Sequence, residues 1–348
     1  MKVGLVCPYD IGKPGGVQQL TGELATQLRD RDIDVLFVGA GSTWFHGGPG
    51  LDSVTVPAGR AISMRANQSK VPLTLSPTRW PKIRRVLDTV DVIHVHEPFI
   101  PLVGWMALSV DKPTVATFHA DPGEWVRRAY RFAPAVNRKS ATVITAVSPT
   151  AASALPARWG EVHIVPNAID VASYAVATGR IDRRVAFLGR DEPRKGLSVL
   201  LEAWPTVIDA VPDAQLRVMG ADRGFEVQGV KWLGPVSGGE KRRMLASSRL
   251  YVSPNLGGES FGIVIAEAMA AGCAVIASAL PAFVDVSGEA AIHVPPGDPR
   301  MLADQMIAVL TDDELAARMS SASLNRVTRF DWSRVVDTYI GLYEKALS

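Results

Sequence analysis

An α/β architecture of parallel sheets covered by helices is predicted by two features of the sequence. Short runs rich in valine, isoleucine and leucine recur along the chain, and each is followed by a longer stretch with helical spacing of its apolar residues. Parallel strands buried on both faces have this apolar composition. Because 348 residues exceed what one hydrophobic core usually holds, we expect two domains.

Expected strands and helices alternate in both halves of the chain. The strands are expected at Val3–Cys7, Val35–Val38, Val92–His96, Thr114–Phe118, Val143–Val147, Val162–Val165, Val185–Leu188, Leu216–Met219, Leu250–Val252 and Ala274–Ala277. The helices are expected at Val17–Leu28, Thr78–Leu87, Leu197–Ala210, Gly262–Ala271, Arg300–Leu310 and Asp331–Leu347. A small, polar stretch at 172–180 separates the two series. We therefore expect domains over residues 1–172 and 173–330, followed by an amphipathic helix at 331–348.

Composition and charge exclude several classes of protein. The formal net charge of +2 is spread over the chain, whereas a nucleic-acid binder usually has a strongly basic domain, so we expect no nucleic-acid partner. No run approaches the ~18 apolar residues of a membrane span, and no signal-peptide core is present. Cys7 and Cys273 lie in apolar surroundings and are expected to be buried thiols. These features predict a cytoplasmic protein, and we expect a monomer.

A pair of glycines follows the first expected strand, at the edge of a parallel sheet where ligands bind. In the run Pro14-Gly15-Gly16-Val17, the absence of side chains lets backbone amides approach a ligand at the positive end of a helix. A diphosphate fits such a place, and a plain tight turn is the alternative. No stretch matches the glycine pattern of dinucleotide dehydrogenases or the P-loop, so these classes are excluded.

Three cations lie within six residues after the first strand of the second half. The run reads Gly189-Arg190-Asp191-Glu192-Pro193-Arg194-Lys195-Gly196. Arginine offers a planar fork of donors and lysine a point charge, a combination suited to a pyrophosphate that gains charge as a sugar leaves. A solvated basic turn is the alternative.

A glycine-rich loop that opens an apolar helix carries two glutamates. Glu259 precedes the helix, and Glu267 lies about one turn inside it, in the run Gly257-Gly258-Glu259-Ser260-Phe261-Gly262-Ile263-Val264-Ile265-Ala266-Glu267. Carboxylates accept hydrogen bonds from hydroxyl groups, which a sugar and a ribose supply. Two carboxylates beside an apolar helix face have no evident structural use, so they indicate a ligand site.

Two histidines and a glutamate on one expected strand raise the question of a metal. The sequence His94-Val95-His96-Glu97 places both histidines on one face of the strand. No third and fourth ligand cluster accompanies them, so we expect packing or cleft-edge histidines and no metal.

These motifs together resemble the retaining family-four glycosyltransferases of the GT-B fold, and most closely the actinobacterial phosphatidylinositol mannosyltransferases. Further matching strings are Val92-Ile93-His94-Val95-His96-Glu97-Pro98, Ala116-Thr117-Phe118-His119 and Val165-Pro166-Asn167. The resemblance implies two Rossmann-like domains that face each other across a cleft, with the last helix packed back on the N-terminal, acceptor-binding domain. It also implies a C-terminal donor-binding domain, GDP-mannose or another nucleotide sugar as donor, and no required cofactor.

The resemblance assigns roles to individual residues of this sequence. Gly16 would approach the donor phosphates, Arg190 and Lys195 would hold the diphosphate, and the amides of Phe261 and Gly262 would add to the cradle. Glu259 would bind the sugar, Glu267 the ribose, Lys241 the guanine, and His119 would line the sugar side. The candidate catalytic residues are His119, Arg190, Lys195 and Glu259, and the candidate donor-binding residues are Gly16, Arg190, Lys195, Lys241, Glu259, Ser260, Phe261, Gly262 and Glu267.

A basic, partly apolar helix is expected at Thr78–Leu87, with a proline in its first turn. Such a helix can lie on an anionic membrane, and a solvated surface helix is the alternative. The candidate acceptor or membrane residues are Asn67, Ser69, Lys70, Arg79, Trp80, Lys82, Arg84 and Arg85.

One departure from the resembling enzymes concerns the acceptor. Where they carry a loop like N-G-S-x-A-R-L-R-x-G-P, this chain reads N-Q-S-K-V-P-L-T-L-S-P at 67–77, so both arginines are missing. The expected activity is α-mannosyl transfer with retention, by front-face displacement, to a phosphatidylinositol-like lipid at the inner membrane face. Transfer to a soluble sugar, polyol or glycan is the alternative, and a non-catalytic nucleotide-sugar-binding protein is a further one.

Overall fold

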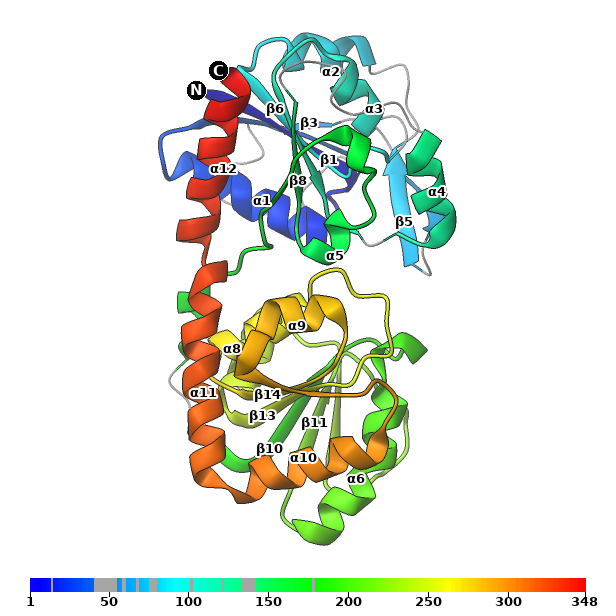
Figure 1. Cartoon of the computed structure of the whole chain (residues 1–348), viewed down its shortest axis with the longest axis vertical. Helices are drawn as coiled ribbons and strands as arrows, with labels where there is room; N and C mark the ends of the chain where they lie inside the picture. Colours follow the sequence, from blue (N-terminus) through cyan, green and yellow to red (C-terminus); the bar gives the residue numbers. More distant parts are fainter. Residues whose placement is uncertain are drawn as a thin grey trace. The chain divides into compact units, whose positions relative to one another are not determined.

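The chain forms two compact units. The computed structural model describes residues 1–13, 15–40, 55–57, 61–66, 69–74, 80–100, 103–120, 122–132, 142–176 and 179–348. Unit 1 contains Met1–Ala168 and Trp332–Ser348, and unit 2 contains Ile169–Asp331 (Figure 1). The division falls at 168/169, beside the boundary expected at 172/173. Each unit is a mainly parallel sheet with flanking helices, which confirms the predicted α/β class.

The sheet of unit 1 has nine strands in the part of the chain that the structure describes. They are β1 (Lys2–Asp10), β2 (Asp34–Ala40), β3 (Thr55–Pro57), β4 (Ala61–Ala66), β5 (Ser69–Thr74), β6 (Val92–His96), β7 (Thr114–Phe118), β8 (Thr142–Ala146) and β9 (Val162–Ile164). Seven of them follow the order β3-β2-β1-β6-β7-β8-β9, with parallel pairing, whereas β5 pairs antiparallel with β1 and β4. The order reverses between β1 and β6, and ligands bind beyond the strand ends at such a switch point.

The helices of unit 1 cover both faces of this sheet. They are α1 (Gly16–Arg29), α2 (Trp80–Leu87), α3 (Val103–Ser109), α4 (Glu124–Phe132), the short α5 (Pro149–Ala152) and α12 (Trp332–Leu347). Side chains of β1 alternate between two apolar clusters: Leu5 packs with α1 and α12, and Val6 packs with α2 and α3. This alternation follows from the two-residue period of a strand.

The last helix packs on unit 1, as predicted. Trp332 buries its ring in the cluster under α1, and its Nε1 donates to Glu23 Oε2 at 3.0 Å. Farther along, Arg31 Nε donates to Asp337 Oδ1 at 2.9 Å. The apolar stripe of α12, with Val336, Tyr339 and Tyr343 at helical spacing, is buried in the same cluster. Unit 1 is therefore built from two distant pieces of the sequence.

The sheet of unit 2 has six parallel strands among the described residues, in the order β12-β11-β10-β13-β14-β15. They are β10 (Ile181–Leu188), β11 (Gln215–Met219), β12 (Val230–Gly234), β13 (Ser248–Ser253), β14 (Ala274–Ser278) and β15 (Ala291–Val294). The helices are α6 (Leu197–Ala210), α7 (Gly238–Ala246), α8 (Ile263–Ala270), α9 (Pro281–Ser287), α10 (Pro299–Thr311) and α11 (Asp313–Val327). Here the order reverses between β10 and β13, so the segments that follow these two strands meet at the switch point.

The sequence expectation about the two cysteines is met. Cys7 and Cys273 are both buried and free. Within the described residues, no helix has the length and apolar character needed to cross a membrane.

Candidate functional site

The centre of the site in unit 2 is the carboxylate of Glu259. Its Oε1 accepts hydrogen bonds from Lys195 Nζ at 2.6 Å, Arg194 Nη1 at 2.8 Å and Asn255 Nδ2 at 2.8 Å. The side chain is 14% exposed, so two charge-assisted contacts form in a largely desolvated place. Lys195 and Glu259, which the sequence assigned to the diphosphate and to the sugar, are thus direct partners.

Backbone packing joins the two segments that carry these groups. The turn after β10 continues as a 3₁₀ turn at Pro193–Lys195 and ends at Gly196, whose φ of +69° is left-handed. A Cβ at Gly196 would lie 1.8 Å from the carbonyl oxygen of Pro254, so only glycine allows this approach. The N–H of Leu256 donates to the carbonyl of Arg194 at 2.8 Å. Lys195 is therefore placed by the backbone.

Arg190 and Arg194 differ in their surroundings. Arg190 is 65% exposed and its Nη1 lies 3.1 Å from Glu192 Oε1. Arg194, which was not among the candidate residues, is more enclosed and bridges Glu192 and Glu259. The sequence indicated Arg194 only as one of a cluster of three cations. Its contact with Glu259, which follows another strand, could not be predicted from the local sequence.

The loop before α8 is held by glycines and an aromatic contact. Gly262 has a φ of +95°, and a Cβ there would lie 2.8 Å from Phe283 Cδ1. Phe261 is buried edge-on against Phe330, with ring centroids 5.5 Å apart. Ser260 lies in this loop, and α8 begins at Ile263, one residue later than predicted. The first amides of α8 follow this fixed loop, in the position where a helix can stabilise an anion.

A second ion pair connects α7 with α8. Lys241 Nζ lies 2.5 Å from Glu267 Oε1, and Glu267 is buried. The ammonium group of Lys241 also lies 6.0 Å from the ring centroid of Tyr174, an aromatic residue that the sequence motifs did not indicate. The candidate base and ribose ligands are therefore adjacent, and Tyr174 is next to them.

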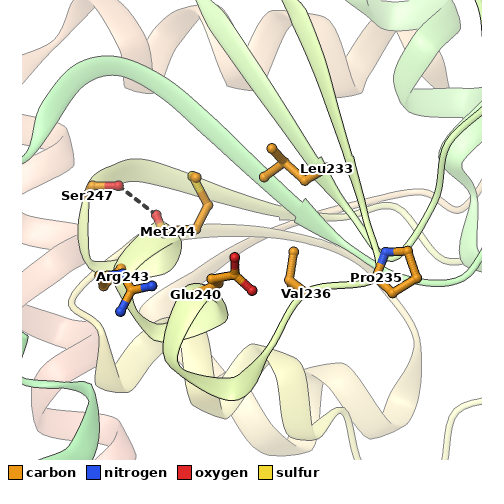
Figure 2. A pocket seen from close by; sticks show the side chains of 7 residues that line it. All are labelled: Leu233, Pro235, Val236, Glu240, Arg243, Met244 and Ser247. Carbon is orange, nitrogen blue, oxygen red and sulfur yellow. Dashed lines mark hydrogen bonds between the residues drawn. The ribbon is translucent and has the colours of Figure 1, made fainter.

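A groove along α7 is separate from these groups. It has a volume of about 320 Å³ and is lined by Leu233, Pro235, Val236, Glu240, Arg243, Met244 and Ser247 (Figure 2). Its carboxylate is already used in the helix cap, since Glu240 Oε2 accepts from the N–H of Ser237 at 2.8 Å and from its hydroxyl at 2.7 Å. No residue that the sequence assigned to the donor lines this groove.

In unit 1, Gly16 is the first residue of α1 and leaves open space beside the backbone. A Cβ at Gly16 would meet nothing within 4 Å in the described structure, so packing does not require glycine there. At Gly15 the atoms nearest to a Cβ would belong to the flexible end of Gln18. Open space at a helix N-terminus is what the predicted approach to a phosphate needs.

Three histidines of unit 1, His94, His96 and His119, form a buried row. His96 Nδ1 and His119 Nε2 lie 2.8 Å apart, while His94 uses its two ring nitrogens for Tyr343 Oη at 2.8 Å and Thr117 Oγ1 at 2.7 Å. Burial lowers the pKa of His94 to about 3 and that of His119 to about 4, so both rings are neutral at neutral pH. His94 is a packing residue, which is one of the two roles expected for this pair.

Glu97 follows this row at the end of β6. It has a left-handed φ of +48°, unusual for a residue with a side chain. Its Oε1 accepts from the backbone N–H groups of His119 at 2.7 Å and Ala120 at 2.8 Å. Burial raises the pKa of its carboxyl to about 7. Glu97 thereby fixes the backbone that presents His119, and no group of three potential metal ligands occurs in the described part of the chain.

The expected membrane helix is α2. Its Lys82, Arg84 and Arg85 are exposed, whereas Trp80 is half-buried and packs against the apolar cluster of unit 1. Ser69 and Lys70 lie on β5, where they pair with Ala66 and Arg65 of β4. Asn67 and Arg79 are outside the described residues.

Comparison with known proteins relates the whole chain to one group of enzymes. Residues 14–173 match the family described as Glycosyltransferase Family 4, and residues 182–312 match that described as Glycosyl transferases group 1. The chain is 37% identical to the phosphatidyl-myo-inositol mannosyltransferase of Mycobacterium leprae (strain TN), over 99% of this chain and 96% of the relative. It is 36% identical to the protein of the same name from Mycobacterium tuberculosis (strain ATCC 25618 / H37Rv), over 99% and 97%.

Solved structures share the fold. A glycosyltransferase from Rickettsia africae ESF-5 has a TM-score of 0.78 at 16% identity and covers 100% of this chain and 98% of its own. Anabaena Alr3699/HepE, solved with UDP and glucose, has a TM-score of 0.75 at 19% identity, with 98% of each chain covered. Two Rossmann-like units of this kind are the GT-B fold. The two family matches define the chain as a glycosyltransferase by class. Its similarity over nearly its full length places it further: the chain belongs to glycosyltransferase family 4.

Proposed function

We propose that the chain transfers a mannosyl group from GDP-mannose to a phosphatidylinositol-like lipid, with retention of the anomeric configuration. The observation that carries this proposal is the similarity, over almost the whole chain, to relatives named phosphatidyl-myo-inositol mannosyltransferase. The donor groups of unit 2 are consistent with it, since cations, a helix N-terminus and two carboxylates lie in the segments after the strands.

The cations around Glu259 are suited to a charged leaving group. Without a ligand, the single oxygen Oε1 accepts from both Lys195 and Arg194. A diphosphate offers these donors a stronger, multivalent anion. Arg190, which precedes them on the same turn, is exposed and pairs with Glu192. As the bond to the sugar breaks, charge grows on the diphosphate, so contacts with Arg190 and Lys195 strengthen in the transition state. Glu259 then accepts hydrogen bonds from sugar hydroxyls.

The remaining roles in this proposal are divided between the two units. Glu267 binds the ribose and Lys241 contacts the guanine. Gly16 and the amides of Phe261 and Gly262 approach the phosphates. His119 lines the sugar side as a neutral ring. No metal or cofactor takes part in this scheme.

The chemical step is a front-face displacement. The acceptor hydroxyl oxygen forms a bond to the anomeric carbon on the face from which the diphosphate oxygen departs. The hydroxyl proton passes to that departing oxygen, so the leaving diphosphate serves as the base. Bond formation and cleavage on one face account for retention, and the chain's residues stabilise charge without forming a covalent intermediate.

The acceptor half of the proposal is supported by α2. Its three exposed cations suit an anionic surface, and a lipid acceptor requires the enzyme to reach one. We accordingly propose a cytoplasmic, monomeric enzyme that binds peripherally to the inner face of the membrane. Transfer to a soluble sugar, polyol or glycan is the second candidate, because residues 67–77 lack the paired arginines of the resembling loop.

One experiment tests donor and acceptor together. The protein is incubated with GDP- and UDP-sugars, each with phosphatidylinositol in mixed micelles or with soluble acceptors, and products are identified by mass spectrometry. We expect a mannosylated lipid from GDP-mannose only. Transfer to soluble acceptors alone would overturn the lipid assignment, and no turnover with any pair would favour the non-catalytic binding protein.

A further inference from the structure

The short helix α3 of unit 1 presents a tryptophan to solvent. Trp105 is 53% exposed, while Val103, Gly104 and Ala107 of the same helix are buried. At 100° per residue, Trp105 points away from the centre of that buried stripe. A large apolar side chain in this place contributes little to the core of unit 1.

The outward faces of α2 and α3 lie on the same side of unit 1. The buried residues of α2, Ile83 and Leu87, belong to the same apolar cluster as Val103 and Ala107 of α3. The two helices also pack against each other, and Figure 1 shows them as neighbours. Because both bury their inner faces in one cluster, their opposite faces turn outward together.

The outward face of α2 is cationic. It carries the exposed side chains of Lys82, Arg84 and Arg85. The first turn of α2 contains no acidic residue that could offset this charge. A cationic face complements an anionic surface, and tryptophan is the side chain that favours the boundary between lipid headgroups and acyl chains.

The two tryptophans near this face have different roles. Trp80 belongs to α2 itself, yet it is half-buried against the apolar cluster. Its ring is therefore part of the packing that holds α2 on unit 1. Trp105, on the neighbouring helix, is the aromatic group available to a partner.

We propose that Trp105 inserts into the headgroup region of an anionic lipid bilayer while Lys82, Arg84 and Arg85 lie at its surface. This inference rests on the membrane-bound form of the proposed function and names the contact that anchors it. The cations supply attraction that salt screens, whereas burial of the indole is insensitive to salt. Binding to the bilayer should therefore have a salt-sensitive part from the cations and a salt-insensitive part from Trp105.

Vesicle binding of the full chain tests this assignment. Phosphatidylcholine vesicles with and without phosphatidylinositol are sedimented with the wild type, Trp105→Ser and the matched control Phe225→Ser. Phe225 is similarly exposed but lies in unit 2. We expect Trp105→Ser to bind vesicles that contain phosphatidylinositol at least about tenfold more weakly and to lose the residual binding at high salt. Phe225→Ser should bind like the wild type.

A second measurement reports insertion directly. Vesicles with brominated acyl chains should quench part of the tryptophan fluorescence of the wild type, and Trp105→Phe should remove that quenched part although seven other tryptophans remain of the eight. Equal sedimentation of Trp105→Ser and Phe225→Ser, or undiminished quenching in Trp105→Phe, would overturn the proposal. Turnover on an acceptor dispersed in detergent separates it from the enzymatic proposal, since Trp105→Ser should keep that activity.

Discussion

Lys241 on α7 and Glu267 on α8 form an ion pair in which Nζ lies 2.5 Å from Oε1. Each of these side chains was a separate candidate for the nucleotide, one for the base and one for the ribose. Their contact means that neither can change without altering the charge balance around the other. The pair is mostly enclosed, with side-chain exposures of 20% and 10%.

The first prediction concerns this pair. Lys241→Met and Glu267→Gln should each weaken GDP binding by about tenfold, because each leaves a partly buried charge without its partner. The double variant should lose less than the sum of the two single losses, with a coupling of about 1 kcal/mol. Calorimetric titration of GDP measures all four proteins. Strictly additive losses would show that the two groups act independently on the nucleotide.

The second prediction separates Glu259 from Glu267. Glu259→Gln should lower mannosyl transfer by about a hundredfold, since the carboxylate is assigned to the sugar and organises Lys195 and Arg194. Its affinity for free GDP should stay within a few-fold of the wild type. Initial rates and GDP titrations, with Glu267→Gln as the comparison, check the assignment. A loss of GDP affinity as large as that of Glu267→Gln would reverse the two roles.

The third prediction concerns the leaving group. Lys195→Ala should lower turnover by at least about tenfold, because a charge-assisted hydrogen bond contributes roughly 1.5 to 3 kcal/mol. Lys231→Ala, which removes an exposed lysine from β12 of the same unit, is the matched control and should have normal turnover. Near-normal kcat in folded Lys195→Ala would remove the proposed role of the Arg190 and Lys195 pair.

The fourth prediction follows from the buried histidines. His94 has a pKa of about 3 in the folded chain and about 6.5 when unfolded, so between these values the unfolded chain binds the extra proton. The contribution of the neutral His94 ring to the free energy of unfolding is fully present above pH 6.5 and is lost as the pH falls toward 3. The pKa of Glu97 is raised to about 7, so this group stabilises the folded chain as the pH falls. The three histidines His94, His96 and His119 have lowered pKa values and outnumber it. Resistance to urea should therefore fall as the pH is lowered from 6.5 to 4.

Substitution of His94 tests the source of this pH dependence. His94→Gln removes the titrating ring and should make the fall in stability with pH shallower, by at most about 1.4 kcal/mol per pH unit. The slope of His163→Gln, a change at a histidine outside the buried row, is compared with the wild-type slope. If both variants had that same slope, His94 would not be a source of the acid sensitivity.

The fifth prediction concerns α2. Neutralising Lys82, Arg84 and Arg85 together as glutamines should remove most of the binding to anionic liposomes at low salt, as high salt should for the wild type, and should leave only the residual binding assigned to Trp105. In the control variant, the exposed residues Lys231, Arg300 and Arg318 of unit 2 are changed to glutamine, so that the same amount of charge is removed outside unit 1. Equal sedimentation of both triple variants would show that α2 is not the membrane contact.

Strands and helices with strong apolar patterns could be predicted from the sequence almost to the residue. The strands Val92–His96 and Thr114–Phe118 and the helix Leu197–Ala210 occur as expected because buried runs and a full amphipathic period are local signals. The edge strand β12 was missed, since V-K-W-L-G is short and mixed in polarity. The helix α11 was missed because its many alanines and serines make the apolar periodicity of the helix weak.

The site could be predicted as a set of residues but not as a set of contacts. Motifs identified Lys195 and Glu259 separately, because each lies in a short distinctive run. Their bond joins residues 64 positions apart and depends on the order of β10 and β13 in the sheet. Arg194 and Tyr174 were not singled out for the same reason, since what distinguishes them is a partner brought close by the fold.

The position of α12 has a consequence for synthesis on the ribosome. Residues 332–348 complete the apolar core of unit 1, yet they are translated after every residue of unit 2. Unit 2 is one uninterrupted segment and can fold as soon as Asp331 has emerged. The nascent unit 1 must wait with the surface under α12 uncovered, so the half of the protein that is made first is the half that finishes last.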